Sequence, residues 1–170
     1  YRKLADEFEQ KIFSQPELYG KAMLTSLEPP KETTIAPKGS ADMVLTFRNV
    51  HNWMRNGYTD AVYDAMYKAL KPGGVLGVVE HRLPDDREQD PKATNGYVKQ
   101  SVVIEQAEKA GFRLKAYTGL LANLSDTADH PEGVWSLPPT LRNVPDDEKQ
   151  KYKAIGESHR MVLKFIKPAE

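Results

Sequence analysis

The sequence predicts an α/β fold built on a mostly parallel sheet, in a single domain over residues 1–170. Short apolar runs alternate with helical patterns along the middle of the chain, as in strand–helix–strand units. Helical crossovers of this length imply parallel strands joined by right-handed connections. The expected parts are a helical lead-in (1–40), an α/β core (41–121), a long polar excursion (122–157) and a last strand (158–168).

Composition and charge narrow the class of protein. Lys plus Arg and Asp plus Glu each number 24, so no net charge draws the chain to nucleic acid or to an acidic membrane. The absence of Cys excludes disulfides, thiolate metal sites and a cysteine nucleophile. No apolar run approaches the ~20 residues that span a bilayer. We expect a cytoplasmic protein, while a periplasmic or secreted one stays open because this composition fits each compartment.

The lead-in is expected to be helical but interrupted. Apolar residues recur at near-helical spacing from Leu4 to Phe13, and Pro16 then breaks that helix or begins a second one. The polar stretch 31–40, which contains Pro37 and Gly39, predicts a loop with at most one short strand.

The core begins with a strand and a helix. Residues 41–47 are mostly apolar without strict alternation, which predicts a parallel strand covered on both faces. Residues 48–53 are expected to form a polar, aromatic-rich turn. A helix with one apolar stripe follows from Thr59, its expected N-cap, and ends at Gly73-Gly74.

The rest of the core repeats the same alternation. A second buried strand is expected at 75–79, followed by an exposed loop over 83–94. The pattern then predicts a helix over 98–110 and a third strand over 112–121. After the excursion, residues 160–166 alternate weakly and predict the last strand.

Three pieces of the core carry a resemblance to a known family. They are Ala41 to Phe47 with the following Arg-Asn-Val-His-Asn-Trp, then Leu-Lys-Pro-Gly-Gly with its strand at 70–79, and Ala-Gly-Phe at 110–112. In order and spacing they resemble the second half of class I, Rossmann-like methyltransferases that use S-adenosylmethionine. The resemblance implies that the last strand is antiparallel, and the chain is similar to a bacterial group of predicted small-molecule methyltransferases.

The family's cofactor-binding front has no counterpart in the sequence. No Gly-x-Gly turn occurs, and no strand precedes the opening helices, so we expect the glycine-rich strand–turn–helix to be missing from this chain. The strand at 41–47 would then expose an apolar edge. We therefore expect a preceding segment, or a second chain as in a homodimer, to cover that edge.

The resemblance places candidate site residues at two strand ends, because ligands of open α/β sheets sit at the carboxyl ends of strands. The residues implied beside S-adenosylmethionine are Phe47, Arg48 and Asn49. His51 and His81 are the candidate catalytic bases, since a histidine near neutral pKa can take the acceptor's proton. Substrate contacts are expected from Asn52, Trp53 and Glu80. No metal site is expected.

Structural roles compete with these assignments. Either histidine could be a structural residue whose ring is hydrogen-bonded within the fold. The Asn49 side chain could hydrogen-bond to the backbone of its own turn, and Glu80 could interact with the start of a helix or pair with Arg82. Aromatic side chains Trp53 and Tyr58 could pack under the following helix, whereas Tyr63 and Tyr67 are expected to cover surface. His130 and Trp135 could belong to a lid, with a mobile loop as the simpler interpretation. A solvated loop is preferred over a metal site for Asp126, Asp129 and His130.

The leading functional hypothesis is an enzyme that transfers a methyl group from S-adenosylmethionine to a small molecule. Two alternatives stay open at this stage. One is a non-catalytic, partial methyltransferase-like module that binds a partner through its open sheet edge. The other is a different doubly wound protein, such as a reductase, in which the same strand–turn–helix pattern arises independently.

Overall fold

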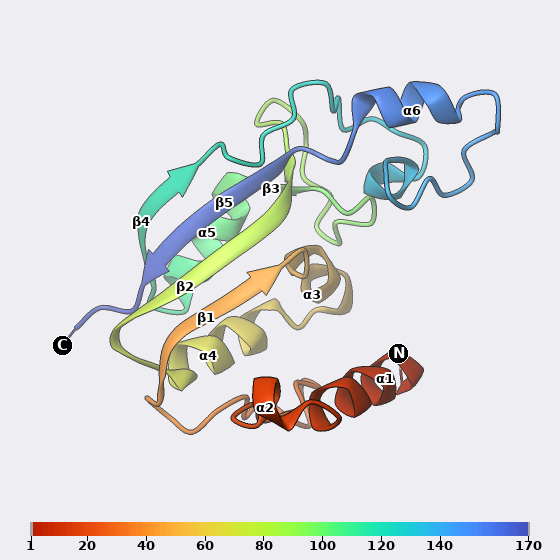
Figure 1. The fold of residues 1–170 in the computed structure, drawn as a ribbon. Helices are drawn as coiled ribbons and strands as arrows, with labels where there is room; N and C mark the ends of the chain where they lie inside the picture. Colours follow the sequence, from red (N-terminus) through yellow and green to blue (C-terminus); the bar gives the residue numbers. More distant parts are fainter. Residues whose placement is uncertain (1, 170) are drawn as a thin grey trace.

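The computed structural model describes residues 2–169 and places their four longest strands side by side in an open sheet (Figure 1). The order across the sheet is β1 (Ala41–Phe47), β2 (Leu70–Leu83), β5 (Arg160–Ile166) and β4 (Arg113–Thr118). The short β3 (Val98–Lys99) pairs in parallel with the last residues of β2. Strands β1 and β2 are parallel, whereas β5 runs antiparallel to both β2 and β4. The predicted mixed sheet with an antiparallel last strand is confirmed.

Two helices cover one face of this sheet. Helices α4 (Thr59–Ala69) and α5 (Gln100–Lys109) lie behind it in Figure 1. Their apolar stripes, including Val62 and Val103, pack against strand residues such as Val78 and Phe165. Tyr63, expected on the surface, lies fully buried in this core because its position on α4 faces the sheet.

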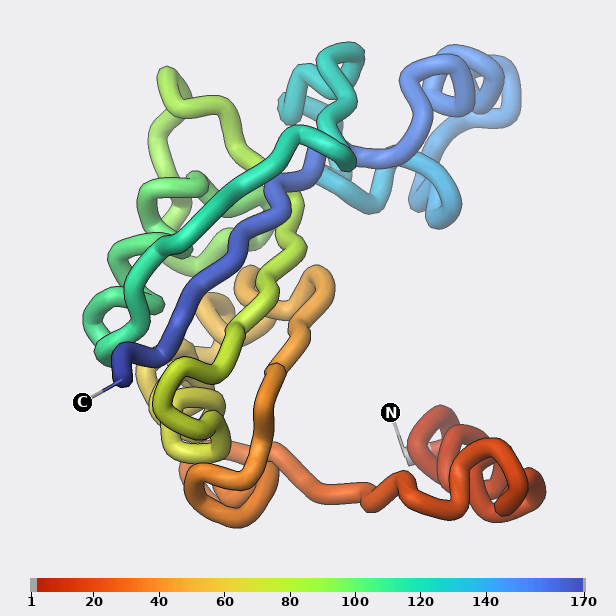
Figure 2. The backbone as a smooth tube through the Cα atoms, turned by 60° about the vertical axis from the view of Figure 1, so that its left-hand side comes forward, coloured from red at the N-terminus to blue at the C-terminus, as the bar shows by residue number. Residues whose placement is uncertain are grey.

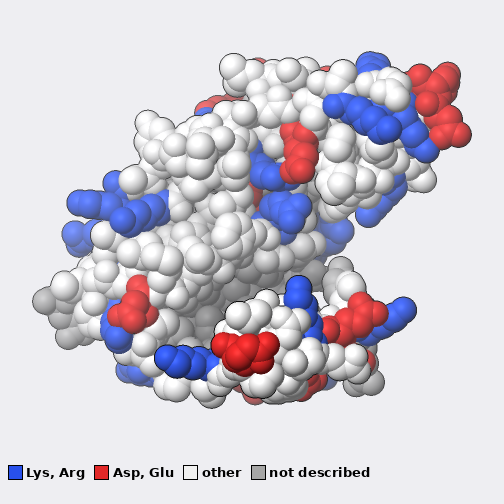
Figure 3. All heavy atoms as spheres, in the orientation of Figure 1, with Lys and Arg blue, Asp and Glu red and all other residues white. Residues whose placement is uncertain are grey.

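The other face of the sheet carries no helix from the described residues. Met43, Leu45 and Phe47 of β1 project from this face and are each 56% exposed, so the expectation of cover on both faces is wrong for the described chain. The face forms a broad uncharged area in Figure 3. Within residues 2–169 no strand pairs with the outer edge of β1 either, so the expected cover of that edge is not supplied here.

Helix boundaries follow local rules, with a few shifts from the predicted ones. Helix α4 begins at Thr59, and its cap is Tyr58 rather than Thr59. It ends at Ala69 instead of reaching the glycines, because Pro72 disfavours helical geometry at the preceding Lys71. Strand β2 therefore starts at Leu70, earlier than expected, and continues to Leu83.

The ends of the core carry less regular structure. Helices α1 (Arg2–Phe13) and α2 (Pro16–Tyr19) lie apart from the sheet in two views (Figures 1 and 2). The excursion contains a short 3-10 helix, η1 (Gly133–Ser136), and helix α6 (Lys149–Ile155).

No helix of the described chain is both long enough and apolar enough to cross a membrane.

Candidate functional site

The carboxyl ends of β1 and β2 meet at one edge of the sheet. Phe47 pairs with Val79 in parallel register, and the Arg48 amide donates a hydrogen bond to the Val79 carbonyl at 2.7 Å. The turn after β1 and the acidic residue after Val79 therefore emerge side by side, as the sequence predicts. This adjacency brings the two groups of candidate residues together.

A helix, rather than the expected turn, follows β1. Arg48 adopts a left-handed conformation (φ 57°) that redirects the chain, and α3 (Val50–Asn56) begins two residues later. Gly57, also left-handed, ends α3, as glycine commonly does after a helix. The short helix turns His51 back toward β2.

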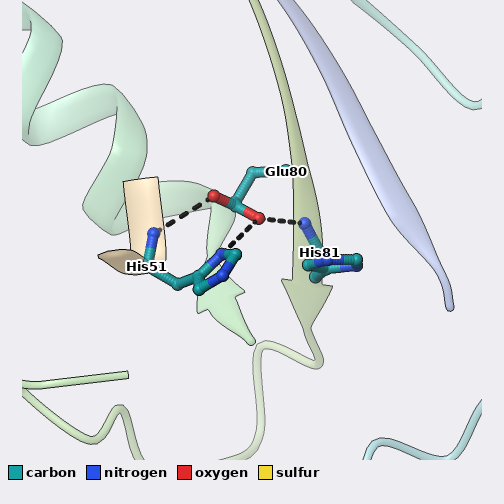
Figure 4. Close-up of side chains that lie close together, drawn as sticks. All are labelled: His51, Glu80 and His81. Carbon is teal, nitrogen blue, oxygen red and sulfur yellow. Dashed lines mark hydrogen bonds and ion pairs between the residues drawn. The ribbon is translucent and has the colours of Figure 1, made fainter. Parts of the chain in front are cut away.

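Glu80 organises the centre of the site (Figure 4). Its Oε2 accepts a hydrogen bond from the His51 backbone amide at 3.1 Å, and its Oε1 lies 3.0 Å from His51 Nδ1. The same Oε1 accepts the His81 amide at 2.8 Å. Glu80 is fully buried, and His51 and His81 are 4% and 7% exposed. The carboxylate thus satisfies an N–H of the first turn of α3, whose donors have no partner within the helix.

This arrangement selects the tautomer of His51. A carboxylate oxygen only accepts hydrogen bonds, so Nδ1 carries the proton in the contact with Glu80. In this tautomer of the neutral ring, the remaining nitrogen, Nε2, is the acceptor. A histidine oriented by a carboxylate in this way is suited to accept a proton from a bound group.

His81 has a different environment. Its Nδ1 lies within hydrogen-bonding distance of the Ser158 hydroxyl, and its ring is 5.5 Å from that of His51 between centroids. Burial lowers the pKa of His81 from 6.5 to about 3, with further contributions from His51, Arg160 and Arg48. His81 is therefore neutral at physiological pH.

These side chains border a pocket of about 400 Å³. Its lining contains most of the predicted site residues and three that were not predicted; the full set is Phe47, Arg48, Asn49, His51, Asn52, Arg55, His81, Trp135 and Arg142. Glu80 lies beneath His51 instead of on the wall. Trp53 does not share the pocket: it lines a separate hollow with Tyr58, and its ring meets that of Tyr63 edge-on at 5.9 Å.

Sequence reasoning missed Arg55 and Arg142, and it weighed Trp135 only as part of a lid. Trp135 sits on η1, which docks on the loop before β3 through a hydrogen bond from the Val134 amide to the Asn95 carbonyl. The only sequence signal was the placement of Trp135 in the polar excursion. Nothing local in the sequence links that segment to α3.

The prediction of a solvated loop is wrong for Asp126 and His130, whose side chains are buried, whereas Asp129 is exposed as expected. Asp126 is buried, and its carboxylate accepts hydrogen bonds from the Tyr97 hydroxyl (2.9 Å) and the His159 amide (2.7 Å). His130 Nε2 lies 2.9 Å from the same carboxylate. Asp126 therefore anchors the excursion to the residue that precedes the start of β5, and these hydrogen bonds account for its burial.

Among the described residues, His51, Glu80 and His81 also bring potential metal-ligating atoms within 4.8 Å of one another. Both Glu80 oxygens are already engaged by N–H donors, and Arg48 adds positive charge close enough to lower the pKa of His81. We interpret this cluster as a hydrogen-bonded site centred on the Glu80 carboxylate.

No family model matches the sequence, and no curated protein matches it. Solved structures share its fold. A putative sarcosine dimethylglycine methyltransferase from Galdieria sulphuraria aligns over 94% of this chain and 64% of its own, with 11% identity and a TM-score of 0.55. A SAM-dependent methyltransferase from Methanosarcina mazei aligns over 82% and 66%, with 10% identity and a TM-score of 0.51. The [4+2]-cyclase SpnF aligns over 88% and 56%, with 15% identity and a TM-score of 0.51.

These likenesses concern the fold. The chain has the fold of SAM-dependent methyltransferases and spans between 56% and 66% of the length of these three structures. A cyclase also has this fold, so the chemistry must be argued from the pocket.

Proposed function

We propose that this chain carries the catalytic pocket of a S-adenosylmethionine-dependent methyltransferase that acts on a small-molecule acceptor. The observation that carries the proposal is His51, held by buried Glu80 on the wall of a pocket at the carboxyl ends of β1 and β2. This is the edge of the sheet where open α/β folds bind their ligands. The fold shared with methyltransferases supports the same conclusion.

The turn after β1 suits the methionine part of the cofactor. Phe47, Arg48 and Asn49 all line the pocket. Asn49 makes no side-chain capping bond to α3, and Arg48 has no carboxylate partner among the described residues, so both can bind a polar ligand. When bound, S-adenosylmethionine would supply a methyl group already activated on its sulfonium sulfur to the acceptor's nucleophilic atom, and the sulfur would leave as a thioether.

His51 is the proposed base. As the acceptor gains the methyl group, its proton passes to Nε2 of His51, while Glu80 stabilises the resulting imidazolium through Nδ1. His81, neutral and bonded to Ser158, is proposed to hold the part of the pocket lining beside His51 by hydrogen bonding. Alignment and exclusion of water supply the remaining catalysis.

The competing hypothesis of a partner-binding module has one supporting observation, the exposed edge and face of β1 at Met43, Leu45 and Phe47. The two hypotheses separate on cofactor binding. Calorimetric titration of the intact natural protein with S-adenosylhomocysteine is expected to show saturable binding. No heat of binding at millimolar ligand would contradict the enzyme proposal and favour the module.

A panel of small acceptors with radiolabelled S-adenosylmethionine then tests the role of His51. His51→Ala should abolish most label transfer while S-adenosylhomocysteine still binds. Equal losses of transfer and of cofactor affinity would instead point to a structural role for His51. Glu88→Gln, an exposed change outside the pocket, is the matched control.

A further inference from the structure

The pocket collects positive charge from three separate segments. Arg48 lies at the end of β1, Arg55 is on α3 and Arg142 is in the excursion, and all three line the pocket. No carboxylate is part of its lining. A concave surface lined by one sign of charge concentrates ligands of the opposite sign.

These guanidinium groups form no salt bridge within the described residues, although Arg55 and Arg142 also line a second hollow with Glu132. The arginines that pair with carboxylates are Arg82, Arg87 and Arg160. Apart from Arg2, whose side chain is outside the description, the remaining arginine is Arg113, far along the sheet on β4. Arginines without an acidic partner are therefore concentrated at this one pocket.

Arg55 and Arg142 are also held in place. The guanidinium carbons of Arg55 and Arg142 lie 5.2 Å and 4.8 Å from the centre of the Trp135 ring. Arg55 Nη2 donates a hydrogen bond to the Thr94 carbonyl at 2.9 Å, and the Arg142 amide donates to the Trp135 carbonyl at 2.7 Å. Cation–π contacts orient a guanidinium without cancelling its charge, so both groups keep donors free for a ligand.

We propose that Arg55 and Arg142 form an oxyanion site that binds a carboxylate or phosphate group of the methyl acceptor. Guanidinium groups match both oxyanions because their planar N–H pairs donate two hydrogen bonds at once. The volume of about 400 Å³ suits a small molecule, and His51 lines the same pocket as the two arginines. The assignment to the acceptor rests on the proposed function, whereas the oxyanion site rests on the pocket alone.

Indole NMR signals provide a direct test. The chain has two Trp residues, so the 1H–15N spectrum contains two indole N–H signals, and Trp135→Phe assigns the one of interest. Inorganic phosphate and benzoate are titrated separately, with chloride keeping the ionic strength constant. We expect the Trp135 signal to shift saturably with at least one of the two anions, and the better ligand identifies the oxyanion class.

Variants decide whether the arginines carry the binding. Arg55→Gln and Arg142→Gln should each weaken the anion affinity by about tenfold, the loss expected for one charge-assisted contact at a partly solvated site. The double variant should lose saturable binding, while Arg113→Gln on β4 should match the parent protein. Amide spectra of each variant show whether the fold is retained.

Two results would contradict the proposed oxyanion site. The first is no saturation by either anion at roughly 100 mM, a concentration far above the dissociation constant that two such contacts predict. The second is unchanged anion binding in the folded double variant. Titration with S-adenosylhomocysteine is a separate measurement. If that ligand fails while anion binding depends on Arg55 and Arg142, the methyltransferase proposal fails and the oxyanion site stands. If it binds and the anions do not, the reverse holds.

Discussion

Replacing Glu80 by Gln tests whether the buried carboxylate organises the site. In the parent protein Oε2 accepts the His51 amide, and Oε1 accepts both the His81 amide and His51 Nδ1–H. A glutamine has one acceptor oxygen and one NH2 group. Whichever way the amide is turned, the NH2 group faces at least one buried backbone N–H, and that donor loses its partner.

The magnitude follows from that lost acceptor. One unsatisfied buried donor costs about 1–3 kcal/mol of unfolding free energy. Removing the buried charge relieves some desolvation, but a carboxylate that accepts three hydrogen bonds is already compensated, so the net change should be destabilising. Glu80→Ala removes the acceptor for two backbone amides and leaves a cavity, and it should cost roughly 3–5 kcal/mol.

Urea denaturation at pH 7, followed by far-ultraviolet circular dichroism, measures both changes. Glu88→Gln is the matched control, because Glu88 is exposed and surface changes usually stay within about 0.5 kcal/mol. Equal unfolding midpoints for Glu80→Gln and Glu88→Gln would refute the reasoning, since a buried acceptor of three hydrogen bonds cannot be replaced without cost.

Two further predictions concern acid stability and the docking of the excursion. Because the pKa of His81 is about 3 in the folded protein and near 6.5 when unfolded, the unfolded chain binds the extra proton. Stability should therefore fall as pH drops from 6.5 toward 3, by up to about 1.4 kcal/mol per pH unit. His81→Asn should flatten this dependence of the unfolding free energy, and an NMR titration of the His81 ring with a midpoint near 6.5 would contradict the argument. Gly133→Ala should destabilise the protein more than Gly39→Ala does. Both glycines have positive φ (57° and 64°), but a Cβ at 133 would lie 2.0 Å from the Asn95 carbonyl oxygen, whereas none lies within 4 Å at 39. Thermal melts compare the two, and equal losses would mean that backbone strain alone matters.

The secondary structure of the core was largely predictable because its signals are local. The strands at 41–47 and 160–166 appear with the predicted bounds, and the helix predicted from Thr59 begins there. Exposure of one face of β1 was not predictable from the run 41–47, since an apolar run does not specify which neighbours cover it. Helix α3 was missed because its start depends on Glu80, which is distant in sequence.

The sequence alone determined the four longest strands but not β3, which lies where a helix was expected, and through the family resemblance it indicated that Arg48 and Glu80 would emerge together. Tertiary structure alone decided that Glu80 binds His51, 29 positions away, and that Arg55 and Arg142 both contact the Trp135 ring. The physical reason is that periodicity and turn residues act within a few positions along the chain. Contacts across the pocket depend on strand register and on how the excursion docks over Gly133, where a carbonyl approaches too closely for any side chain.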